Sequence, residues 1–512
     1  MNGDLNIQFT HNKMDTKDKI NITFLNLAAQ SPSLELNLAF SEKIHLENKR
    51  QKHILFMCDR ALKSCSVNIF NDRNICNICR FKAKKGFKEF KRRNPNSQLI
   101  KISRSDLSSK NFDSKIIDKT NEKEFLLGVH STIGSQLRLE NMDLLNRKWK
   151  KVKSRMLESS YGLYNYFHRF FSEYQTENFV IFNGRLSCSR PLIEIAKKHS
   201  VNYHLFDAAL NGKVPMYSTN EMFHSIEFEK RNSFITYLKW FKESRDLAER
   251  YFLSKINRVP INDVAYTKNQ ISGHIDKHII EMKKPIISIF VSSDDEYRFI
   301  GSDWSQYTIF DQIDSIRELF NSKLSKHYDF VVKMHPNQKN IHKSTMERYK
   351  ELGKELSVLL PESYTDSYAL IKKSELIINF CSSIALEANY MRKPVVQIGP
   401  SSFMRFMIAN IVESIDEAVD LIYNKEYKVM PKRGSIISFT YYMKPSFKLP
   451  AYNFLEDGVY AYGGKSCRAP LYLRLIAVPA KIYVHWIKGN KEILSNFTMY
   501  FTNLIFGQTR VK

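Results

Sequence analysis

The stretch VVKMHPN at residues 331–337 and the stretch LIINFCSSIALEA at residues 376–388 decide the fold class of this sequence. Each opens with a short, mostly apolar run of strand length and then turns polar. In the first, Pro336 ends the strand directly after His335, because proline cannot continue the hydrogen-bond ladder. In the second, a serine pair precedes a helical pattern, where serine caps free N–H groups. Strands that lead into helices in this way indicate βαβ units and a parallel sheet.

The same alternation continues on both sides of these stretches. We expect strands at residues 53–57, 179–182, 203–206, 286–291, 330–334, 376–380 and 395–398. We expect helices at residues 142–173, 190–199, 311–324, 344–356, 367–372 and 383–391. The chain turns polar around residues 271–284, which indicates a domain boundary near residues 275–285.

The predicted fold class is therefore α/β, with two Rossmann-like lobes facing a cleft and a C-terminal helical tail. A length of 512 residues suits two domains, since a single core rarely grows that large. The predicted parts are an N-terminal extension at residues 1–50, an N-terminal Rossmann-like lobe at 51–280, a C-terminal Rossmann-like lobe at 281–430 and a helical, aromatic and basic tail at 431–512.

The composition favours a globular protein with anionic partners. Hydrophobic residues make up 43% of the chain, which is too much for a disordered protein. The formal net charge is +25, from 78 Lys+Arg against 53 Asp+Glu. That charge suits nucleic acid, an anionic membrane surface and a phosphorylated substrate equally, so it does not choose among them.

The termini favour a cytoplasmic location. The N-terminal MNGD lacks the basic and apolar order of a signal peptide, and seven unevenly spread cysteines are typical of cytosolic thiols. Residues 475–480 and 493–509 are too short or too polar for a spanning helix, which needs roughly 20 apolar residues. Basic clusters at residues 82–93 and 147–155 and the aromatic tail suit peripheral binding to the inner face of the membrane. Packing of the tail on the first lobe is the alternative.

Polar residues at the strand ends of the second lobe are the main candidates for binding and catalysis. An imidazole such as that of His335 donates to a phosphate oxygen or protonates a leaving group near neutral pH. Ser382 and Ser383 open a helix whose N–H groups and dipole attract anions. Glu387, about one turn later, suits ribose hydroxyls. The simpler interpretations are a strand-ending turn, plain N-capping and a solvated glutamate.

A loop of each lobe adds weaker candidates. The serine and acidic loop after residue 291 offers Ser293 and Glu296 to donor or acceptor hydroxyls, with a solvated acidic turn as the alternative. In the first lobe Asn183, Gly184 and Arg185 end a strand. Arg190 follows on the next helix, and two guanidiniums near a helix start suit a phosphate or carboxylate. Asp207, which ends a later strand, is the candidate base for the acceptor hydroxyl.

Residues 286–399 resemble the C-terminal lobe of bacterial capsule polysaccharide biosynthesis glycosyltransferases. The matching pieces are VSSDDEY (291–297), VKMHPN (332–337), SYALIKKSELIINF (367–380), SSIALEANY (382–390) and KPVVQIG (393–399). Related GT-B families share His-Pro and Ser-Ser motifs that hold nucleotide phosphates, among them bacterial sialyltransferases, Kdo transferases and teichoic-acid polymerases. The resemblance implies a GT-B fold with donor phosphate at His335 and Asn337, phosphate or nucleotide at Ser382 and Ser383, and ribose at Glu387.

The resemblance has one departure. Bacterial sialyltransferases take their base from an acidic-acidic-glycine motif in the first lobe, before the other two motifs. Here the tripeptide EDG occurs at residues 456–458, after them. Asp457 is a candidate base only if the tail folds back over the cleft, and an acidic turn ended by glycine is the simpler interpretation.

Four cysteines lie within 22 residues: Cys58, Cys65, Cys76 and Cys79. Four thiolates this close suit a structural zinc ion. The first pair is wider than in zinc ribbons, and Cys58 ends an apolar strand where a buried free thiol is ordinary. Both interpretations stay open. The resemblance implies that catalysis itself requires no metal or other cofactor.

The sequence therefore predicts a glycosyltransferase of the EC 2.4 class in capsule or lipopolysaccharide assembly. Its expected partners are a CMP-, CDP-, UDP- or GDP-linked sugar and a lipid-linked or oligosaccharide acceptor, with no nucleic acid. A CDP-polyol phosphotransferase of teichoic-acid type is the first alternative, since it also uses a His-Pro element. A basic nucleic-acid-binding protein with a Cys-rich zinc module is the second.

Overall fold

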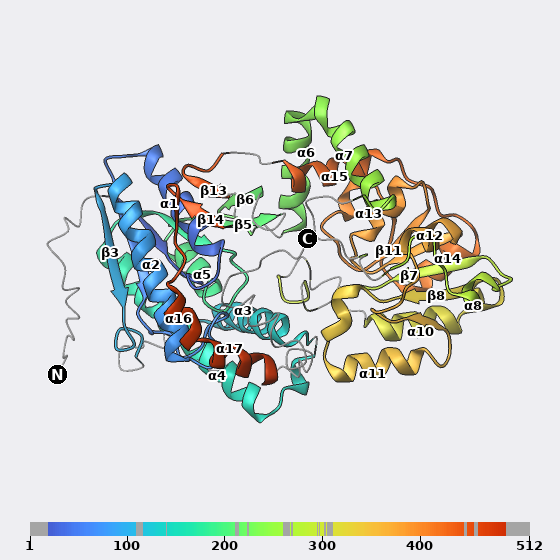
Figure 1. The fold of residues 1–512 in the computed structure, drawn as a ribbon, viewed down its shortest axis with the longest axis horizontal. Coiled ribbons are helices and arrows are strands. Elements are labelled where there is room, and N and C mark those ends of the chain that lie inside the picture. The colour runs from blue at the N-terminus through green and yellow to red at the C-terminus, as the bar shows by residue number, and fades with distance from the viewer. Residues whose placement is uncertain are drawn as a thin grey trace.

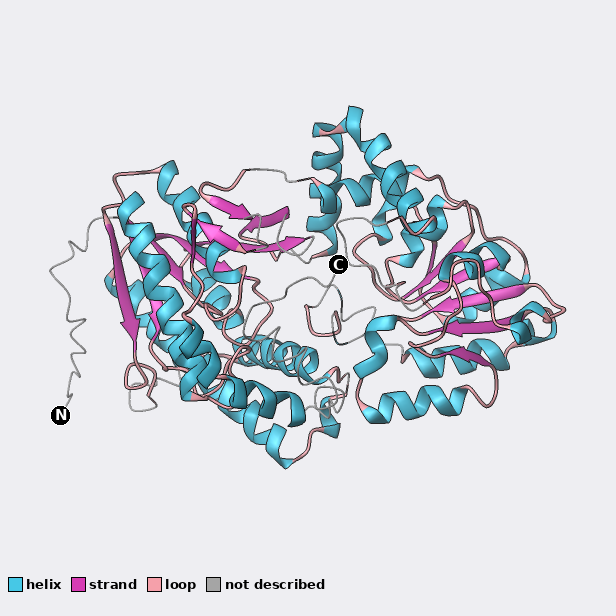
Figure 2. Cartoon of the chain, in the orientation of Figure 1, coloured by secondary structure: helices cyan, strands magenta, loops and turns pink. Residues whose placement is uncertain are grey.

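The computed structural model describes residues 19–108, 116–139, 141–209, 214–222, 225–259, 267, 270–293, 295, 297–301, 304, 311–444, 448–454 and 459–487. These residues form two α/β lobes, each built on a largely parallel sheet with helices packed against it (Figures 1 and 2). The predicted α/β class with two Rossmann-like lobes is confirmed.

The first sheet has the strand order β3-β2-β1-β4-β5-β6. Its strands are β1 (Ile20–Phe24), β2 (Lys52–Cys58), β3 (Ser97–Ile102), β4 (Thr176–Phe182), β5 (Asn202–Ala209) and β6 (Val214–Thr219). Neighbours pair in parallel as far as β5, and β6 runs antiparallel to β5.

Strand β1 is central in this sheet, with Ile22 opposite Ile54 of β2 and Phe179 of β4. The predicted N-terminal extension at residues 1–50 is therefore wrong for this segment. Polar residues inside β1 make this strand difficult to predict from the sequence. Asn21 and Thr23 are fully buried, and each hydrogen-bonds to other side chains, so their polarity does not expose the strand to water.

The second sheet has the order β12-β11-β10-β7-β8-β9, and all its pairs are parallel. Its strands are β7 (Ile286–Phe290), β8 (Asp329–Lys333), β9 (Ser357–Leu359), β10 (Leu376–Asn379), β11 (Val395–Ile398) and β12 (Asn410–Val412). The predicted strands at residues 286–291, 330–334, 376–380 and 395–398 match β7, β8, β10 and β11.

Counted within its own lobe, each sheet has the strand order 3-2-1-4-5-6 of Rossmann folds. The order reverses between the first and fourth strands, which are β1 and β4 in one lobe and β7 and β10 in the other. Open α/β sheets bind ligands outside the carboxyl ends of the strands at this switch point. The topology therefore indicates where each lobe presents its binding loops.

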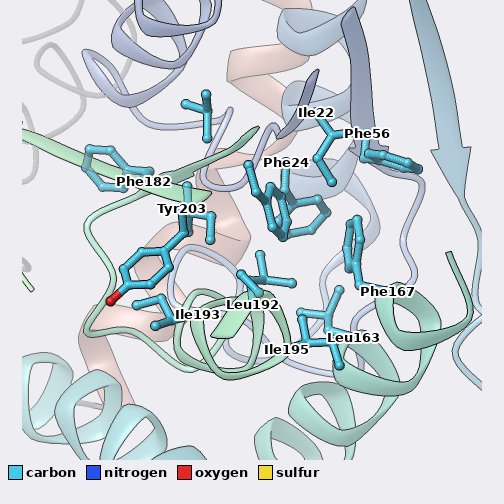
Figure 3. Packing of buried hydrophobic residues seen from close by; sticks show 14 of the residues in the cluster. Ile22, Phe24, Phe56, Leu163, Phe167, Phe182, Leu192, Ile193, Ile195 and Tyr203 are labelled. Carbon is cyan, nitrogen blue, oxygen red and sulfur yellow. The ribbon is translucent and has the colours of Figure 1, made fainter. Parts of the chain in front are cut away.

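Polar side chains cap several of the first-lobe helices. They are α1 (Ser33–Glu47), α2 (Arg73–Arg93), α3 (Lys119–Leu137), α4 (Arg147–Glu173) and α5 (Arg190–Lys198), with the 3-10 turn η3 (Met142–Leu144). The side chains of Asp72, Asp118 and Asn146 cap α2, α3 and α4. Figure 3 shows Phe24 and Phe56 of the sheet packed near Phe167 of α4, at ring distances of 6.1 and 5.1 Å.

The second lobe has shorter helices between its strands. They are α8 (Lys277–Ile280), α10 (Gln312–Asn321), α11 (Lys343–Leu352), α12 (Ser367–Lys373), α13 (Ile384–Tyr390) and α14 (Ile415–Tyr423), with the 3-10 turns η6 (Lys323–Lys326), η7 (Pro336–Asn340) and η8 (Met404–Phe406). Apolar residues of β7, β8, β10, α10 and α14 form its main core.

Two helices before residue 280 pack with the second lobe, against the prediction that residues 51–280 form the first lobe. Helices α6 (Ile226–Lys239) and α7 (Phe241–Ile256) lie beside α15 (Arg433–Met443) (Figure 1). The Phe252 ring stacks on Tyr390 of α13 and lies 5.5 Å from Phe439 of α15. The polar segment at residues 271–284 is a connection within this lobe, so composition misplaced the boundary.

The tail leaves the second lobe after α15 and returns to the first lobe. It contains an antiparallel sheet of β13 (Tyr452–Phe454), β14 (Tyr460–Tyr462) and β15 (Lys465–Ser466), followed by α16 (Leu471–Ile476) and α17 (Val478–Ile487). Tyr462 donates to Glu42 of α1 at 2.7 Å, and α16 packs on α2 (Figure 1). The expected helical tail thus includes a small sheet. Among the described residues, no helix is long and apolar enough to cross a membrane.

Candidate active site

The carboxyl ends of the two sheets face each other. The loop after β7 carries Asp295, whose Oδ2 lies 3.2 Å from Nη1 of Arg138 at the end of α3. The same loop carries Ile300, whose carbonyl accepts a hydrogen bond from Arg190 at the start of α5. Because α5 follows β4 and the loop follows β7, these contacts bring the two switch points to the same interlobe region.

Ser292, in the loop after β7, is held by hydrogen bonds from three sides. The Ser292 hydroxyl bonds to the Phe380 carbonyl at the end of β10, and its backbone N–H donates to Gln312 Oε1 at 3.0 Å. The Ser292 carbonyl accepts from the side chains of Gln312 and Gln338, at 3.0 and 3.1 Å. Elements α10, η7 and β10 therefore converge on one residue at the switch point of the second sheet.

The neighbouring Ser293 is the most informative residue of this loop. Its side chain is 7% exposed, and its hydroxyl has no hydrogen-bond partner in the described part of the chain. A buried hydroxyl without a partner is rare and costs about 1–3 kcal/mol. A hydroxyl kept at that cost next to the firmly bonded Ser292 is ready to bond to a ligand. The sequence predicted Ser293 at this site.

His335 caps the 3-10 turn η7 directly after β8. The Nδ1 of His335 accepts the backbone N–H of Asn337 at 3.1 Å. The backbone N–H of His335 donates to Gln338 Oε1 at 2.8 Å. An imidazole nitrogen that accepts a hydrogen bond carries no proton, so the proton of the neutral ring is on Nε2. The neutral ring of the half-buried His335 therefore carries its proton on Nε2, at the carboxyl end of β8.

The two serines after β10 differ in exposure and in hydrogen bonding. Ser382 is buried and its hydroxyl accepts the Ile384 N–H at 3.5 Å, whereas Ser383 is exposed and its side chain forms no cap bond. Cys381 has φ +62°, so the chain turns sharply before α13. Ser383 is thus the more accessible of the two predicted phosphate residues.

Glu387 is engaged inside the protein. Its Oε2 accepts from Tyr368 of α12 at 3.0 Å, and its Oε1 lies 3.9 Å from Nζ of Lys255 on α7. The side chain is 9% exposed. These contacts link α13 to α12 and α7, and they compete with the predicted contact to ribose, which stays a prediction.

In the first lobe the turn after β4 brings two predicted groups together. Asn183 has φ +65° and Gly184 has φ +85°, which reverses the chain within two residues. The Asn183 amide donates to Oδ2 of Asp207 on β5 at 2.6 Å. The backbone N–H of Arg185 donates to Asn183 Oδ1 at 3.3 Å. The candidate base Asp207 therefore has a fixed orientation next to the turn.

Arg190 lies at the start of α5, as predicted, but its guanidinium contacts protein groups. It is 4% exposed, its Nε lies 2.9 Å from Glu124 Oε2 of α3, and it also bonds to the Ile300 carbonyl of the other lobe. A guanidinium held by these groups braces the two lobes. Its predicted contact with a phosphate or carboxylate ligand has no support in this arrangement.

Asn26 is a site residue that the sequence analysis missed. It follows β1 at the switch point of the first sheet, is 4% exposed, and donates to the Ser189 hydroxyl at 2.9 Å. Its Oδ1 is buried and has no hydrogen-bond partner in the described residues. The strand-like run INITFL, which directly precedes Asn26, could have indicated that Asn26 lies at a strand end. The assignment of residues 1–50 to an extension left this strand out of the predicted sheet. Glu296 and Asp457, predicted as ligand and base, lie outside the described residues.

Three of the four clustered cysteines, Cys58, Cys65 and Cys79, pack against the first-lobe core. Burial raises the pKa of Cys58 to about 11 and of Cys79 to about 12, and it also raises those of Cys65 and Cys76. Within the described ranges, no group of three or more His, Cys, Asp or Glu side chains is placed to hold a metal ion.

The structural-zinc hypothesis stays a prediction with a direct measurement. It predicts about one equivalent of zinc in the purified protein and a lower melting temperature after chelation, because a structural metal contributes to folding. Elemental analysis of freshly reduced protein measures the first quantity, and thermal unfolding with and without chelator measures the second. Metal-free protein whose melting temperature does not change with chelator would contradict the zinc hypothesis and would mean that the four cysteines are neutral free thiols.

A separate hollow of about 810 Å³ opens between the lobes beside α10 and α11. Its lining includes His130, Asn141, Arg298, Asp311 and Arg348. Burial lowers the pKa of His130 to about 4, so its ring is neutral at physiological pH. The predicted residues Ser293, His335 and Ser382 do not line this hollow, so the candidate site rests on the switch-point geometry.

The chain matches no protein-family model and no curated protein. It is similar to the solved KpsC β-Kdo 2,4 transferase of Thermosulfurimonas dismutans, with 11% identity over 52% of this chain and 79% of that one and a TM-score of 0.31. It is also similar to UDP-GlcNAc 2-epimerase from Neisseria meningitidis bound to UDP-GlcNAc, with 9% identity over 83% and 98% and a TM-score of 0.25. The wall teichoic acid polymerase TagF has 12% identity over 82% and 83% and a TM-score of 0.20. At these values the similarities carry no argument about function.

Proposed function

We propose that this chain is a glycosyltransferase that moves a sugar from a nucleotide-sugar donor, bound by the second lobe, to an acceptor bound by the first. One observation carries the proposal. Beside Ser292, which is held by several hydrogen bonds, the buried Ser293 hydroxyl has no partner among the described residues, at the switch point of a Rossmann-ordered sheet. The Nε2–H of His335 and the accessible Ser383 follow the two strands on either side, β8 and β10. Donors at three neighbouring strand ends suit a diphosphate.

These donors favour departure of a nucleotide. In the proposed reaction an acceptor oxygen forms a bond to the anomeric carbon, and the bond from that carbon to the phosphate oxygen breaks. Negative charge then grows on the leaving phosphate, where Nε2–H of His335 stabilises it or transfers its proton. Asp207, oriented by Asn183, is the proposed base that takes the proton of the acceptor hydroxyl.

The first-lobe core argues against a nucleic-acid-binding zinc module. Cys58 and Cys65 pack against the same core as β1, β2 and β4, and Cys79 packs on an adjoining cluster. They are parts of the lobe and do not form a separate finger. The polyol-phosphate transfer of teichoic-acid type differs in product, because the phosphate then stays with the acceptor. Product analysis separates the two reactions.

The proposed acceptor is a growing capsule or lipopolysaccharide chain, lipid-linked or free, and the proposed place is the cytoplasmic face of a membrane. Two observations support a peripheral association. The net charge is +25, and α16 and α17 carry exposed large apolar side chains beside basic residues. The donor is a CMP-, CDP-, UDP- or GDP-linked sugar, and a thermal-shift screen of the four nucleotides identifies which, since a ligand of the native state raises its stability.

The Ser293→Ala variant tests the nucleotide site. We expect it to bind the nucleotide found by that screen at least ~10-fold more weakly, because it lacks a hydrogen bond to a charged group. Its melting temperature without ligand should be unchanged or higher, because the deleted hydroxyl had no partner. Isothermal titration calorimetry and thermal unfolding measure the two quantities.

The neighbouring Ser292→Ala is the matched control. It removes a hydroxyl that bonds to the Phe380 carbonyl, so it should lower the melting temperature of the free protein. If Ser293→Ala binds every nucleotide as the wild type does, the loop after β7 is not the donor site and the proposal fails.

A further inference from the structure

A group of cations lies where the tail covers the first lobe. We call Lys82 of α2, Arg474 of α16 and Lys481 of α17 the cation cluster. Helices α16 and α17 pack on α2 and on the loops after β1 and β2, through Leu473, Ala477, Ala480 and their apolar neighbours. Asn74 at the start of α2 donates to the Ile476 carbonyl at 3.2 Å, which anchors α16. The cluster is thus built by segments about 400 residues apart in the sequence.

Lys82 has an acidic partner. It is 4% exposed, donates to the Ser31 hydroxyl at 2.7 Å, and lies 4.0 Å from the buried carboxylate of Glu35. Glu35 also accepts from Ser31 at 3.2 Å. The carboxylate of Glu35 therefore already pairs with Lys82, one of the three cations.

The other two cations have no such partner. Among the described residues, no ion pair joins Arg474 or Lys481 to a carboxylate, and Nε and Nη1 of Arg474 are buried without a hydrogen-bond partner. Burial lowers the pKa of Lys481, and nearby Lys82 and Arg474 lower it further. Burial, followed by the nearness of Arg468, lowers the pKa of Arg474. Half-buried cations that lie close together without an anion repel one another, so an entering anion relieves the repulsion.

The surface around the cluster is apolar. On α16 the side chains of Leu471, Tyr472, Leu475 and Ile476 are 45%, 63%, 39% and 50% exposed, and Tyr483 of α17 is 45% exposed. Lys148 of α4 donates to the Tyr483 hydroxyl at 2.6 Å and lies over its ring. Large apolar side chains next to unpaired cations match an amphiphile that carries a negative charge.

We propose that Arg474 and Lys481, with Lys82 behind them, bind the phosphate of an anionic phospholipid headgroup while the apolar side chains of α16 lie among the acyl chains. This inference rests on the proposed membrane-side function and gives it a specific site. It assigns Arg474 and Lys481 a direct ligand, in contrast to a general attraction spread over the whole basic surface.

The test is sedimentation of the full chain with vesicles of phosphatidylglycerol or phosphatidylcholine at moderate salt. The wild type should sediment with phosphatidylglycerol and remain in solution with phosphatidylcholine. The Arg474→Gln/Lys481→Gln variant should bind phosphatidylglycerol at least ~10-fold more weakly, since two contacts to one phosphate are lost. It should unfold at the wild-type temperature or above, because it loses two half-buried charges that have no carboxylate partner among the described residues.

The Lys372→Gln/Lys373→Gln variant is the matched control. It changes the net charge equally at two exposed residues of α12 on the other lobe, and its lipid binding should stay close to that of the wild type. A Leu475→Ser/Ile476→Ser variant, altered only at exposed side chains, should also bind phosphatidylglycerol more weakly.

Three outcomes overturn the inference. Equal losses of phosphatidylglycerol binding in the two charge variants would mean that the attraction is diffuse. Equal sedimentation of the wild type with both lipids would mean that the anionic headgroup is not recognised. If millimolar inorganic phosphate stabilises the wild type but not Arg474→Gln/Lys481→Gln, and no vesicle binds, free phosphate is the ligand. None of these measurements uses sugar transfer, so failure here leaves the glycosyltransferase proposal standing.

Discussion

His335→Ala is expected to lower kcat/KM for sugar transfer at least ~100-fold, the scale of a lost acid or phosphate contact in a transition state. The reason is the orientation of the ring. Because Nδ1 accepts the Asn337 N–H, Nε2 carries the proton of the neutral imidazole and is the nitrogen that can donate to the leaving phosphate. The measurement is the initial rate of transfer with the donor identified by nucleotide screening.

A change in folding must be separated from a change in chemistry, because His335 also caps η7. Loss of a cap costs ~1 kcal/mol. His335→Asn is the control, since asparagine is a strong cap residue that can still accept the Asn337 N–H but lacks the Nε2 donor. We expect wild-type stability and a rate as low as that of His335→Ala. A rate near the wild-type value in either folded variant would exclude His335 from catalysis.

The second lobe was predictable because its signals are local. Its strands β7, β8, β10 and β11 are short, mostly apolar runs between polar turns, which is the pattern of a buried parallel strand. The strand ends, and therefore His335 and Ser293, follow directly from that pattern. Strands β9 and β12 have three residues each, too few to show a period.

The first lobe was less predictable, because its decisive contacts join distant parts of the chain. The buried polar residues of β1 find partners in α1 and β2 that no local pattern reveals. The same reason explains contacts of the candidate site residues that the sequence could not reveal. Glu387 contacts Tyr368 and Lys255, and Arg190 contacts Glu124, all far away in the sequence. The residue type was predictable, but its partner was not.

The turn at Gly184 joins the fold to the site, so its replacement is expected to damage both. A Cβ on Gly184 would lie 2.8 Å from Cδ1 of Leu205, 3.1 Å from Sδ of Met222 and 3.2 Å from Cδ1 of Ile193. The φ of +85° adds backbone strain for any side chain. Together, overpacking and strain should make Gly184→Ala less stable by about 2–4 kcal/mol.

Gly273→Ala isolates the backbone part of that loss. Gly273 has φ +74°, and among the described residues no atom lies within 4 Å of the position that a Cβ would take there. It should therefore lose only about 1 kcal/mol, the cost of a left-handed conformation. Urea unfolding of both variants, compared at an unchanged m-value, gives the packing part as the difference. Equal losses would show that the turn has room for a side chain.

The same substitution at Gly184 also tests the proposed base. The shift that relieves contact with Leu205 must move the turn away from β5, the strand that carries both Leu205 and Asp207. Asn183 then loses its 2.6 Å bond to Asp207, and the carboxylate loses its orientation. Under conditions where Gly184→Ala remains folded, its transfer rate should fall about 10-fold or more, because a small misplacement of a reacting group is costly. Nucleotide affinity should be unchanged, since the second lobe is untouched. A folded Gly184→Ala variant with the wild-type transfer rate would mean that Asp207 is not the base. Weaker nucleotide binding by this variant would mean that the donor also contacts the first lobe.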